Sequence, residues 1–239
     1  MDTLKFKKRH TLVIAHRGLS GIEPENTCAA FIAAGNRSYY GIETDIHRTA
    51  DGQFAVVHDK DLCRVAGIDL SVEDNDLSSL QQVVLYDKRG KVDRRDLRVP
   101  SLQDYLEICK TYGKQCVLEL KSEFTAMEIE KIVEILKAKD WFQNTTFISF
   151  SYENLRKIRA LLPQQSLQFL TDKIDEMTVA RLVADRIDLD IRAKALTKEW
   201  VKKQHKNRLK VNCWTVDDPK TAEKLSAWGV DYITSNILE

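Results

Sequence analysis

The sequence has no apolar stretch long enough to cross a membrane as a helix, which needs about 20 consecutive apolar residues. The basic residues at its start, in "MDTLKFKKRHTLVIAHRG", precede an apolar run too short for the core of a signal peptide. It also has no low-complexity tract and no linker. These absences favour a soluble, cytoplasmic protein without stable membrane insertion, built as a single domain over residues 1–239.

Cysteine is scarce, and neither sign of charge dominates. The five cysteines are an odd number without a C-x-x-C pair, which favours free thiols in a reducing compartment over a zinc site. Lys and Arg total 37 and Asp and Glu 36, a net charge of +1, and no basic stripe with interleaved aromatic residues occurs. The composition therefore predicts no nucleic-acid partner. The cysteines are Cys28, Cys63, Cys109, Cys116 and Cys213.

Short apolar segments alternate with amphipathic ones along the whole chain. The apolar segments are typical of buried strands, and repeated strand–helix units predict a parallel sheet. Eight such units in 239 residues predict an α/β fold, the (β/α)8 TIM barrel. The expected strands cover residues 11–16, 41–46, 116–120, 145–150, 167–170, 187–191, 210–216 and 230–234.

Capping signals mark several of the helices. Thr125 with Glu128, and Ser101 with Asp104, have the spacing of a capping box. Asp218 precedes a proline at the first helical position, as helix starts often do.

The segment 53–59, "QFAVVHD", resembles a ninth strand. It follows the second strand too closely for a parallel crossover, so we expect an antiparallel β-hairpin that turns at Asp51-Gly52. A two-residue loop would place His58 opposite Asp45, and a three-residue loop with a glycine bulge would place it opposite Thr44. Residues 60–99 are polar without a clean period, and we expect a small insertion over the C-terminal mouth of the barrel.

The C-terminal ends of barrel strands carry catalytic groups, and here they carry a consistent set. Glu43, Asp45 and Glu119 are three carboxylates on neighbouring strands, which favours a hard divalent cation, Mg²⁺ or Ca²⁺. Arg17 and Lys121 add positive charge suited to a phosphate.

Two histidines complete the set. His16 follows the first strand and His58 the hairpin, and a pair of such bases suits general acid and general base chemistry. A lone strand-end histidine is usually structural, but so many polar groups at one end of the barrel favour phosphoester cleavage at a single metal ion. The remaining histidines, His10, His47 and His205, are expected to be incidental.

The motifs "HRG", "PENT", "E-T-D", "HD", "L-E-L-K", "WTV" and "GVDYIT" resemble, in order and spacing, the glycerophosphodiester phosphodiesterase family over about residues 12–235. The resemblance implies a metal-dependent barrel enzyme that hydrolyses glycerophosphodiesters, small-molecule substrates, to sn-glycerol 3-phosphate and an alcohol. It implies His16 and His58 as the acid/base pair and Trp214 as an apolar wall for the glycerol end. It further implies Glu43, Asp45 and Glu119 as metal ligands and Arg17 and Lys121 as phosphate ligands.

The resemblance also extends to residues behind the site. Glu25, Asn26 and Asp59 are expected to support it, while Asn26 or Thr27 could cap the next helix. The stretch "ITSN" stands where many relatives have an aspartate followed by proline, and we expect this departure to affect only a peripheral contact.

Three other readings remain open. A related barrel phosphodiesterase could act on lysophospholipids or phosphoinositides, like a lysophospholipase D or a phospholipase C, and a third reading is a non-catalytic binding barrel. The sequence is compatible with a monomer and with a homo-oligomer.

Overall fold

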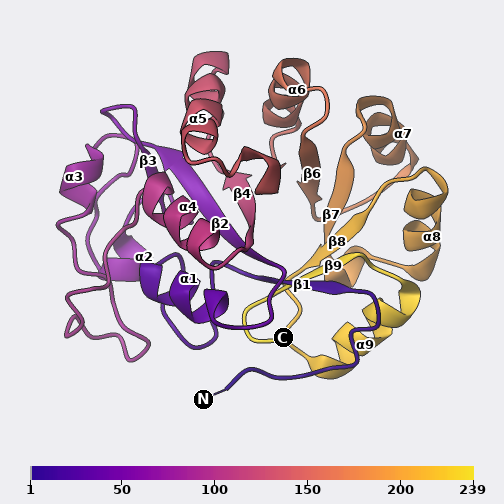
Figure 1. Cartoon of the computed structure of the whole chain (residues 1–239), viewed down its shortest axis with the longest axis horizontal. Coiled ribbons are helices and arrows are strands. Elements are labelled where there is room, and N and C mark those ends of the chain that lie inside the picture. The colour runs from indigo at the N-terminus through magenta and orange to yellow at the C-terminus, as the bar shows by residue number, and fades with distance from the viewer. Residues whose placement is uncertain (1) are drawn as a thin grey trace.

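The computed structural model describes residues 2–239 and contains a closed barrel of parallel strands ringed by helices (Figure 1). One nine-stranded sheet runs in the order β1-β9-β8-β7-β6-β5-β4-β2-β3, and pairing of β1 with β2 closes it. The predicted (β/α)8 barrel is therefore confirmed, with β3 lying outside the eight-stranded ring. The strands are β1 (Leu12–Ala15), β2 (Gly41–Arg48), β3 (Phe54–Val56), β4 (Gln115–Leu120), β5 (Thr145–Ser149), β6 (Ser166–Thr171), β7 (Asp188–Arg192), β8 (Val211–Trp214) and β9 (Tyr232–Ser235).

The helices follow the strands in the expected alternation. Two short helices, α2 (Cys63–Ala66) and α3 (Leu77–Leu80), belong to the insertion between the hairpin and the next barrel helix. None of the helices in residues 2–239 combines the length and apolar character needed to span a bilayer. The larger helices are α1 (Cys28–Gly35), α4 (Leu102–Thr111), α5 (Ala126–Ala138), α6 (Tyr152–Leu161), α7 (Glu176–Asp185), α8 (Lys198–Lys206) and α9 (Pro219–Trp228).

The predicted capping signals operate as expected. Ser101 starts α4 and Thr125 starts α5, each with a complete capping box. Asp218 accepts from the backbone of Thr221 at the start of α9. At α1 the cap is Thr27, which leaves Asn26 free for another role.

The hairpin after β2 takes the three-residue loop. Ile46 pairs with Val56 and Arg48 with Phe54, and the same register places His58 opposite Thr44. Gly52 has a φ of +67°, the left-handed conformation that a glycine bulge requires. His58 lies beyond the last paired residue, so the sheet does not dictate the face on which its ring lies.

Three apolar clusters organise the interior. The largest fills the space between the sheet and the outer helices, and a small one around Ile14, Val117 and Ile148 fills the barrel. The third belongs largely to the insertion, where Leu62, Val72 and other apolar side chains pack under the hairpin. The sequence did not predict this small core, because residues 60–99 are mostly polar and the apolar residues among them have no regular spacing.

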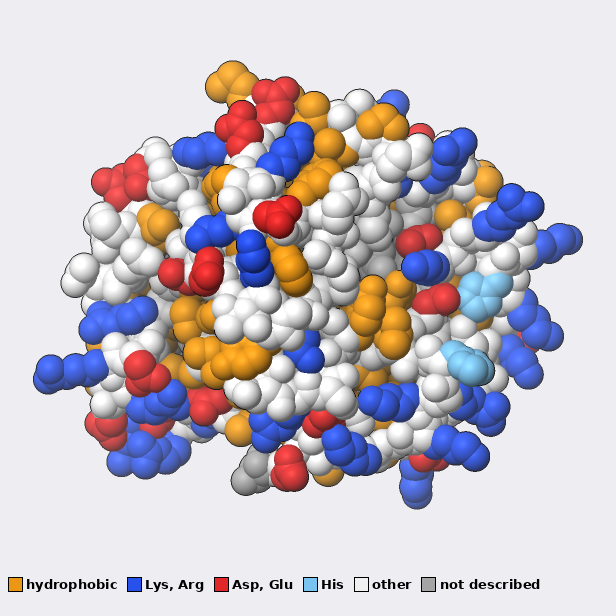
Figure 2. All heavy atoms as spheres, viewed as in Figure 1, with side chains coloured by type: hydrophobic (Ala, Val, Ile, Leu, Met, Phe, Trp, Pro, Cys, Tyr) orange, Lys and Arg blue, Asp and Glu red, His pale blue; other side chains and the backbone are white. Residues whose placement is uncertain are grey.

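The surface shows no dominant charge on the face drawn in Figure 2. Acidic and basic side chains are interspersed there, and apolar side chains form small groups between them. This distribution agrees with the net charge of +1.

Candidate active site

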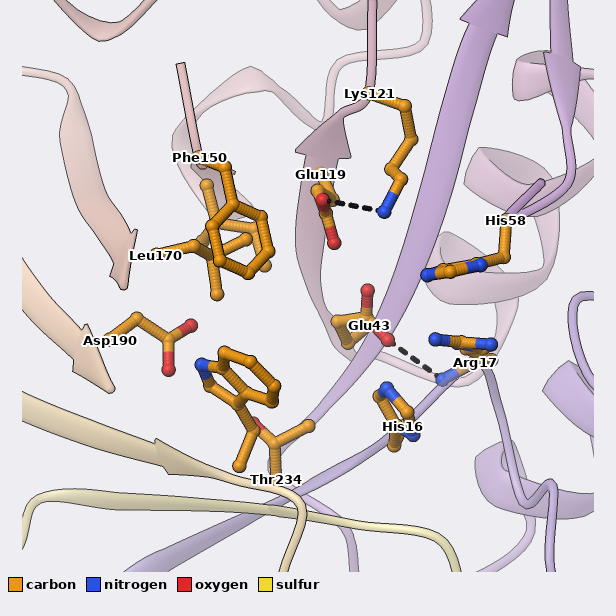
Figure 3. A pocket seen from close by; sticks show the side chains of 12 residues that line it. His16, Arg17, Glu43, His58, Glu119, Lys121, Phe150, Leu170, Asp190 and Thr234 are labelled. Carbon is orange, nitrogen blue, oxygen red and sulfur yellow. Dashed lines mark hydrogen bonds and ion pairs between the residues drawn. The ribbon is translucent and has the colours of Figure 1, made fainter. Parts of the chain in front are cut away.

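A cavity of about 390 Å³, counting its open mouth, lies at the C-terminal end of the barrel. Its lining is polar and charged on one side and apolar on the other (Figure 3). Every predicted catalytic and substrate-binding residue reaches it, whereas none of residues 60–99 lines it. The lining residues are His16, Arg17, Glu43, His58, Glu119, Lys121, Ile148, Phe150, Leu170, Asp190, Trp214 and Thr234.

The three predicted carboxylates form one cluster at the floor of this cavity. Glu43 and Asp45 share the inner face of β2 because they are two residues apart, and Asp45 pairs with Glu119 on β4. One oxygen from each of the three lies within 4.8 Å of the others, and all three residues are buried. Burying three carboxylates together costs free energy unless a cation or protons neutralise their charge.

The surrounding groups hold one oxygen of each carboxylate and leave the other available. The backbone N–H of Arg17 donates to Glu43 Oε2 at 2.8 Å, and Lys121 Nζ lies 2.9 Å from Glu119 Oε1. Asn26 Nδ2 donates to Asp45 Oδ2 at 2.8 Å, while the buried Asp45 Oδ1 accepts no hydrogen bond and lies 3.6 Å from Lys121 Nζ. Asn26 thus contacts the cluster directly, and Thr44 donates to its amide oxygen; its supporting role in the reaction stays a prediction.

The environment separates the pKa values of the three carboxyl groups. Burial and the charges of Asp45 and Glu119 raise the pKa of Glu43 well above its usual range. Burial and Asp45 likewise raise the pKa of Glu119 to about 8. Burial opposes ionisation of Asp45 as well, but Arg17 and Lys121 outweigh it and lower its pKa. The cluster therefore binds protons in the absence of another cation.

The loop after β1 adopts an uncommon backbone to bring Arg17 over the cluster. Arg17 and Gly18 have φ values of +54° and +78°, and the Gly18 N–H donates to the Glu43 carbonyl at 3.3 Å. A Cβ on residue 18 would lie 2.7 Å from Ala30, so only glycine fits against α1. This close approach explains the glycine of the "HRG" motif.

A chain of ion pairs links Arg17 to His58 through the insertion. Arg17 Nη1 lies 2.8 Å from Glu25 Oε1, and Arg64 pairs with both Glu25 and Asp59. Asp59 in turn accepts from His58 Nδ1 at 2.6 Å. Glu25 thus contacts Arg17 and Asp59 contacts His58, with Arg64 of α2 between them, and their supporting role in the reaction stays a prediction.

His16 is oriented by the C-terminal end of β9. Its Nδ1 lies 2.8 Å from Asn236 Oδ1, and Asn236 Nδ2 donates to Asp217 at 2.7 Å. Because the amide donates to Asp217, its oxygen faces His16, which makes Nδ1 the donor and leaves Nε2 free. The expectation that "ITSN" makes only a peripheral contact is therefore wrong, since its asparagine contacts His16 directly.

His58 also presents Nε2 to the cavity, because its Nδ1 donates to the Asp59 carboxylate. Its backbone is held by His47, whose Nε2 donates to the His58 carbonyl at 3.1 Å. His47 was expected to be incidental, and this contact corrects that expectation. Burial lowers the pKa of both His16 and His58, and the charge of Arg17 acts in the same direction, whereas the charge of Asp45 opposes it at both rings.

The opposite side of the cavity is apolar. Phe150 and Trp214 pack edge to face with ring centroids 5.6 Å apart, and Ile148 and Leu170 continue the wall. Trp214 thus belongs to an apolar wall of the cavity, and its contact with a glycerol moiety stays a prediction. Asp190, which the sequence analysis did not single out, is the one carboxyl group on this side of the lining.

Comparison with known proteins places the chain among phosphodiesterases. A family model for the glycerophosphoryl diester phosphodiesterase family matches residues 16–238. The Bacillus subtilis protein YhdW is 32% identical over 233 residues, covering 94% of this chain and 93% of YhdW. The glycerophosphodiester phosphodiesterase of Caldanaerobacter subterraneus subsp. tengcongensis is 29% identical over 230 residues, covering 95% of this chain and 94% of that protein.

A solved structure is similar over almost the whole length. A phosphodiesterase from Oleispira antarctica, in complex with the product sn-glycerol-3-phosphate, superposes with a TM-score of 0.88 at 29% identity. The match covers 98% of this chain and 96% of that one.

Proposed function

The chain belongs to the glycerophosphoryl diester phosphodiesterase family and is a phosphoric diester hydrolase, and we propose that it cleaves glycerophosphodiesters to sn-glycerol 3-phosphate and an alcohol. One observation carries the proposal for this chain. A buried cluster of three carboxylates and two histidines with free Nε2 atoms face one cavity, beside Arg17 and Lys121. The Oleispira antarctica enzyme, which holds sn-glycerol 3-phosphate, supports the same product here.

The donor set fits a hard divalent cation. Glu43, Asp45 and Glu119 would each offer one carboxylate oxygen, and the buried Asp45 Oδ1, which accepts no hydrogen bond and has only the Lys121 ammonium 3.6 Å away, supports a cation there. Oxygen ligands alone favour Mg²⁺ or Ca²⁺ over zinc. When bound, the cation would neutralise the cluster and supply positive charge for the phosphate oxygens.

Arg17 and Lys121 are proposed to bind the phosphate. Both side chains line the cavity, and both are held in place by carboxylates from behind. Burial disfavours the charged form of each, but the neighbouring carboxylates outweigh it and raise both pKa values. Both groups therefore stay cationic at neutral pH, which suits an oxyanion.

The two histidines are proposed to exchange protons with the substrate. One enters the cycle neutral and accepts the proton of the attacking hydroxyl at Nε2, and the other enters it as the imidazolium and donates its Nε2 proton to the leaving alcohol. Each such transfer contributes ~10²- to 10⁴-fold to the rate. The attacking group is proposed to be the glycerol 2-hydroxyl, because a tethered and oriented nucleophile gains an effective molarity of ~10⁵ M or more.

In this sequence the O2–P bond forms as the bond to the head-group oxygen breaks. Water then opens the cyclic phosphodiester while the histidines exchange roles, which restores their starting protonation states.

The test is a substrate panel with and without chelator. We expect glycerophosphoethanolamine to be hydrolysed, a 2-deoxy analogue to lose several orders of magnitude in kcat, and activity to return when Mg²⁺ or Ca²⁺ replaces chelator. Lysophosphatidylethanolamine, the substrate of the lipid-directed alternative, should be cleaved more slowly. Full turnover in excess chelator would contradict the metal assignment, and rapid cleavage of the deoxy substrate would contradict internal attack.

A further inference from the structure

Two buried polar atoms without partners face the apolar side of the active-site cavity. Asp190 is only 1% exposed, and its Oδ1 has no hydrogen-bond partner. The Nε1 of Trp214 is likewise buried and unpartnered, and both residues line the cavity. In Figure 3 the Asp190 carboxyl group projects into this space. Buried polar atoms in native proteins are almost always hydrogen-bonded, so two such atoms without partners on one cavity wall indicate a binding site for a ligand.

The barrel interior fixes the direction of the Asp190 carboxyl group. Asp190 and Asn212 are paired neighbours on β7 and β8. Asn212 Nδ2 contacts Asp190 Oδ2 and Gln168 Oε1, both at 3.1 Å, while Thr234 donates to Asn212 Oδ1 at 3.2 Å. This network uses one carboxyl oxygen and turns the other toward the cavity, so the site is built before any ligand arrives.

The lining at this end of the cavity holds no cationic side chain, and Arg192, whose Cζ lies 5.2 Å from the centroid of the Trp214 ring, is not part of it. Burial raises the pKa of Asp190 well above its usual range, against the smaller effect of the Asn212 hydrogen bond, and so favours the neutral acid. Its neighbours on the wall, Ile148, Phe150 and Leu170, are apolar. A charged ligand group would lose its hydration here without gaining a counter-ion.

We propose that Asp190 and the indole N–H of Trp214 form a subsite for one uncharged alkyl hydroxyl group. A hydroxyl both donates and accepts, so it can satisfy both orphan atoms at once. The proposal rests on the proposed function, under which the ligand is the free primary hydroxyl of the glycerol moiety. With the phosphate at Arg17 and Lys121, the glycerol then lies against the apolar wall and the head group extends toward the open mouth.

The experiment pairs a change in the ligand with a change in the protein. Glycerophosphoethanolamine is compared with its analogue in which the primary hydroxyl is replaced by hydrogen, which keeps the 2-hydroxyl that attacks. Wild-type enzyme should prefer the natural substrate by at least tenfold in kcat/KM. Asp190→Leu and Trp214→Phe should each reduce this preference, and Asp190→Leu should bring it near unity by losing activity on the natural substrate alone.

Two further variants separate recognition from structure. Asp190→Asn keeps a polar group of the same shape facing the cavity and should retain most of the preference. Asp188→Asn changes a carboxyl group on the same strand that lies outside both the cavity lining and the Asn212 network, and it should leave the preference unchanged. Equal losses on both substrates in Asp190→Leu, or an Asp188→Asn variant that loses the preference as completely, would overturn the proposal.

Binding measurements keep the subsite and the reaction apart. Calorimetric binding of sn-glycerol 3-phosphate and of 1,2-propanediol 1-phosphate needs no turnover, and the wild type should favour the first by at least tenfold. If that preference is present and Asp190-dependent while no glycerophosphodiester is hydrolysed, the proposed function fails and the subsite stands. If phosphocholine or phosphoethanolamine instead shows the Asp190 dependence, the subsite binds a cation and the proposal is wrong.

Discussion

Exchanging the side chains of Asp217 and Asn236 tests how His16 is controlled. In the present arrangement a neutral amide oxygen contacts His16 Nδ1, and the charged carboxylate lies one residue further back. The double variant Asp217→Asn/Asn236→Asp keeps a donor–acceptor chain of the same length. It moves the negative charge forward until it contacts the imidazole.

The expected effect is a raised pKa for His16. Burial and the charge of Arg17 now lower this pKa. Two unit charges about 4 Å apart interact by about 4 kcal/mol at an effective dielectric constant of about 20, which equals about 3 pKa units. The amide oxygen already contributes part of this attraction, so we expect a net rise of about 1 to 2 units.

The assay combines a histidine NMR titration, assigned with His16→Gln, and the pH profile of kcat/KM. The limb of the profile that His16 governs should move to higher pH by about 1 to 2 units. Asp217→Asn alone is the control. It places two amide NH₂ groups next to each other, which should turn the Asn236 oxygen away from His16. The lost hydrogen bond should lower kcat/KM by roughly 5- to 100-fold. An unchanged His16 pKa in the double variant would refute the role given to Asn236.

Three other perturbations follow from the geometry. The pKa of Glu119 is raised to about 8 from a usual 4.5, so the contribution of this group to the free energy of unfolding is present below about pH 4.5 and is lost as pH rises through about 8. In chelator, Glu119→Gln should therefore have a higher free energy of unfolding than the wild type between pH 5 and 9. Denaturant unfolding should show a difference of up to about 5 kcal/mol. Tyr105→Phe removes the hydroxyl that donates to the Ile42 carbonyl and accepts from the Val117 N–H, so chemical unfolding should show a loss of about 1–3 kcal/mol. Gly18→Ala combines a φ of +78° with a contact of 2.7 Å to Ala30, and its kcat should fall while far-UV circular dichroism stays native; wild-type kcat would contradict the close approach.

Local signals predicted much of the fold. The strand segments, the capping boxes at Ser101 and Thr125 and the cap at Asp218 are short-range patterns, and each is present in the structure. The carboxylate cluster was also predictable, because Glu43 and Asp45 are two apart on a strand and Glu119 ends its neighbour. The hairpin left two registers open, and the choice between them depended on the conformation of Gly52.

Long-range contacts were beyond the reach of the sequence. Arg64 is one of 37 basic residues in a segment without periodicity, and only folding brings it to Glu25 and Asp59. Asn236 meets His16 across 220 positions, and no spacing rule joins them. His47 lies two residues after Asp45 on β2 but contacts the His58 backbone carbonyl and does not line the cavity, so its residue type gave no signal.

The apolar cluster of residues 60–99 allows this segment to unfold locally as one cooperative unit. It packs on itself and on Ala55 and Val57 of the hairpin, and polar contacts tie it to the barrel, among them Arg64 with Glu25 and Lys88 Nζ with the Ser20 carbonyl at 2.7 Å. Such a segment can open as a unit while the barrel stays folded, and its amide hydrogens would then exchange with solvent together. Each opening breaks the contacts of Arg64 with Glu25 and Asp59, which hold Arg17 and His58 in place. A ligand that binds Arg17 and His58 in their closed positions would therefore slow hydrogen exchange in residues 60–99 without contacting them.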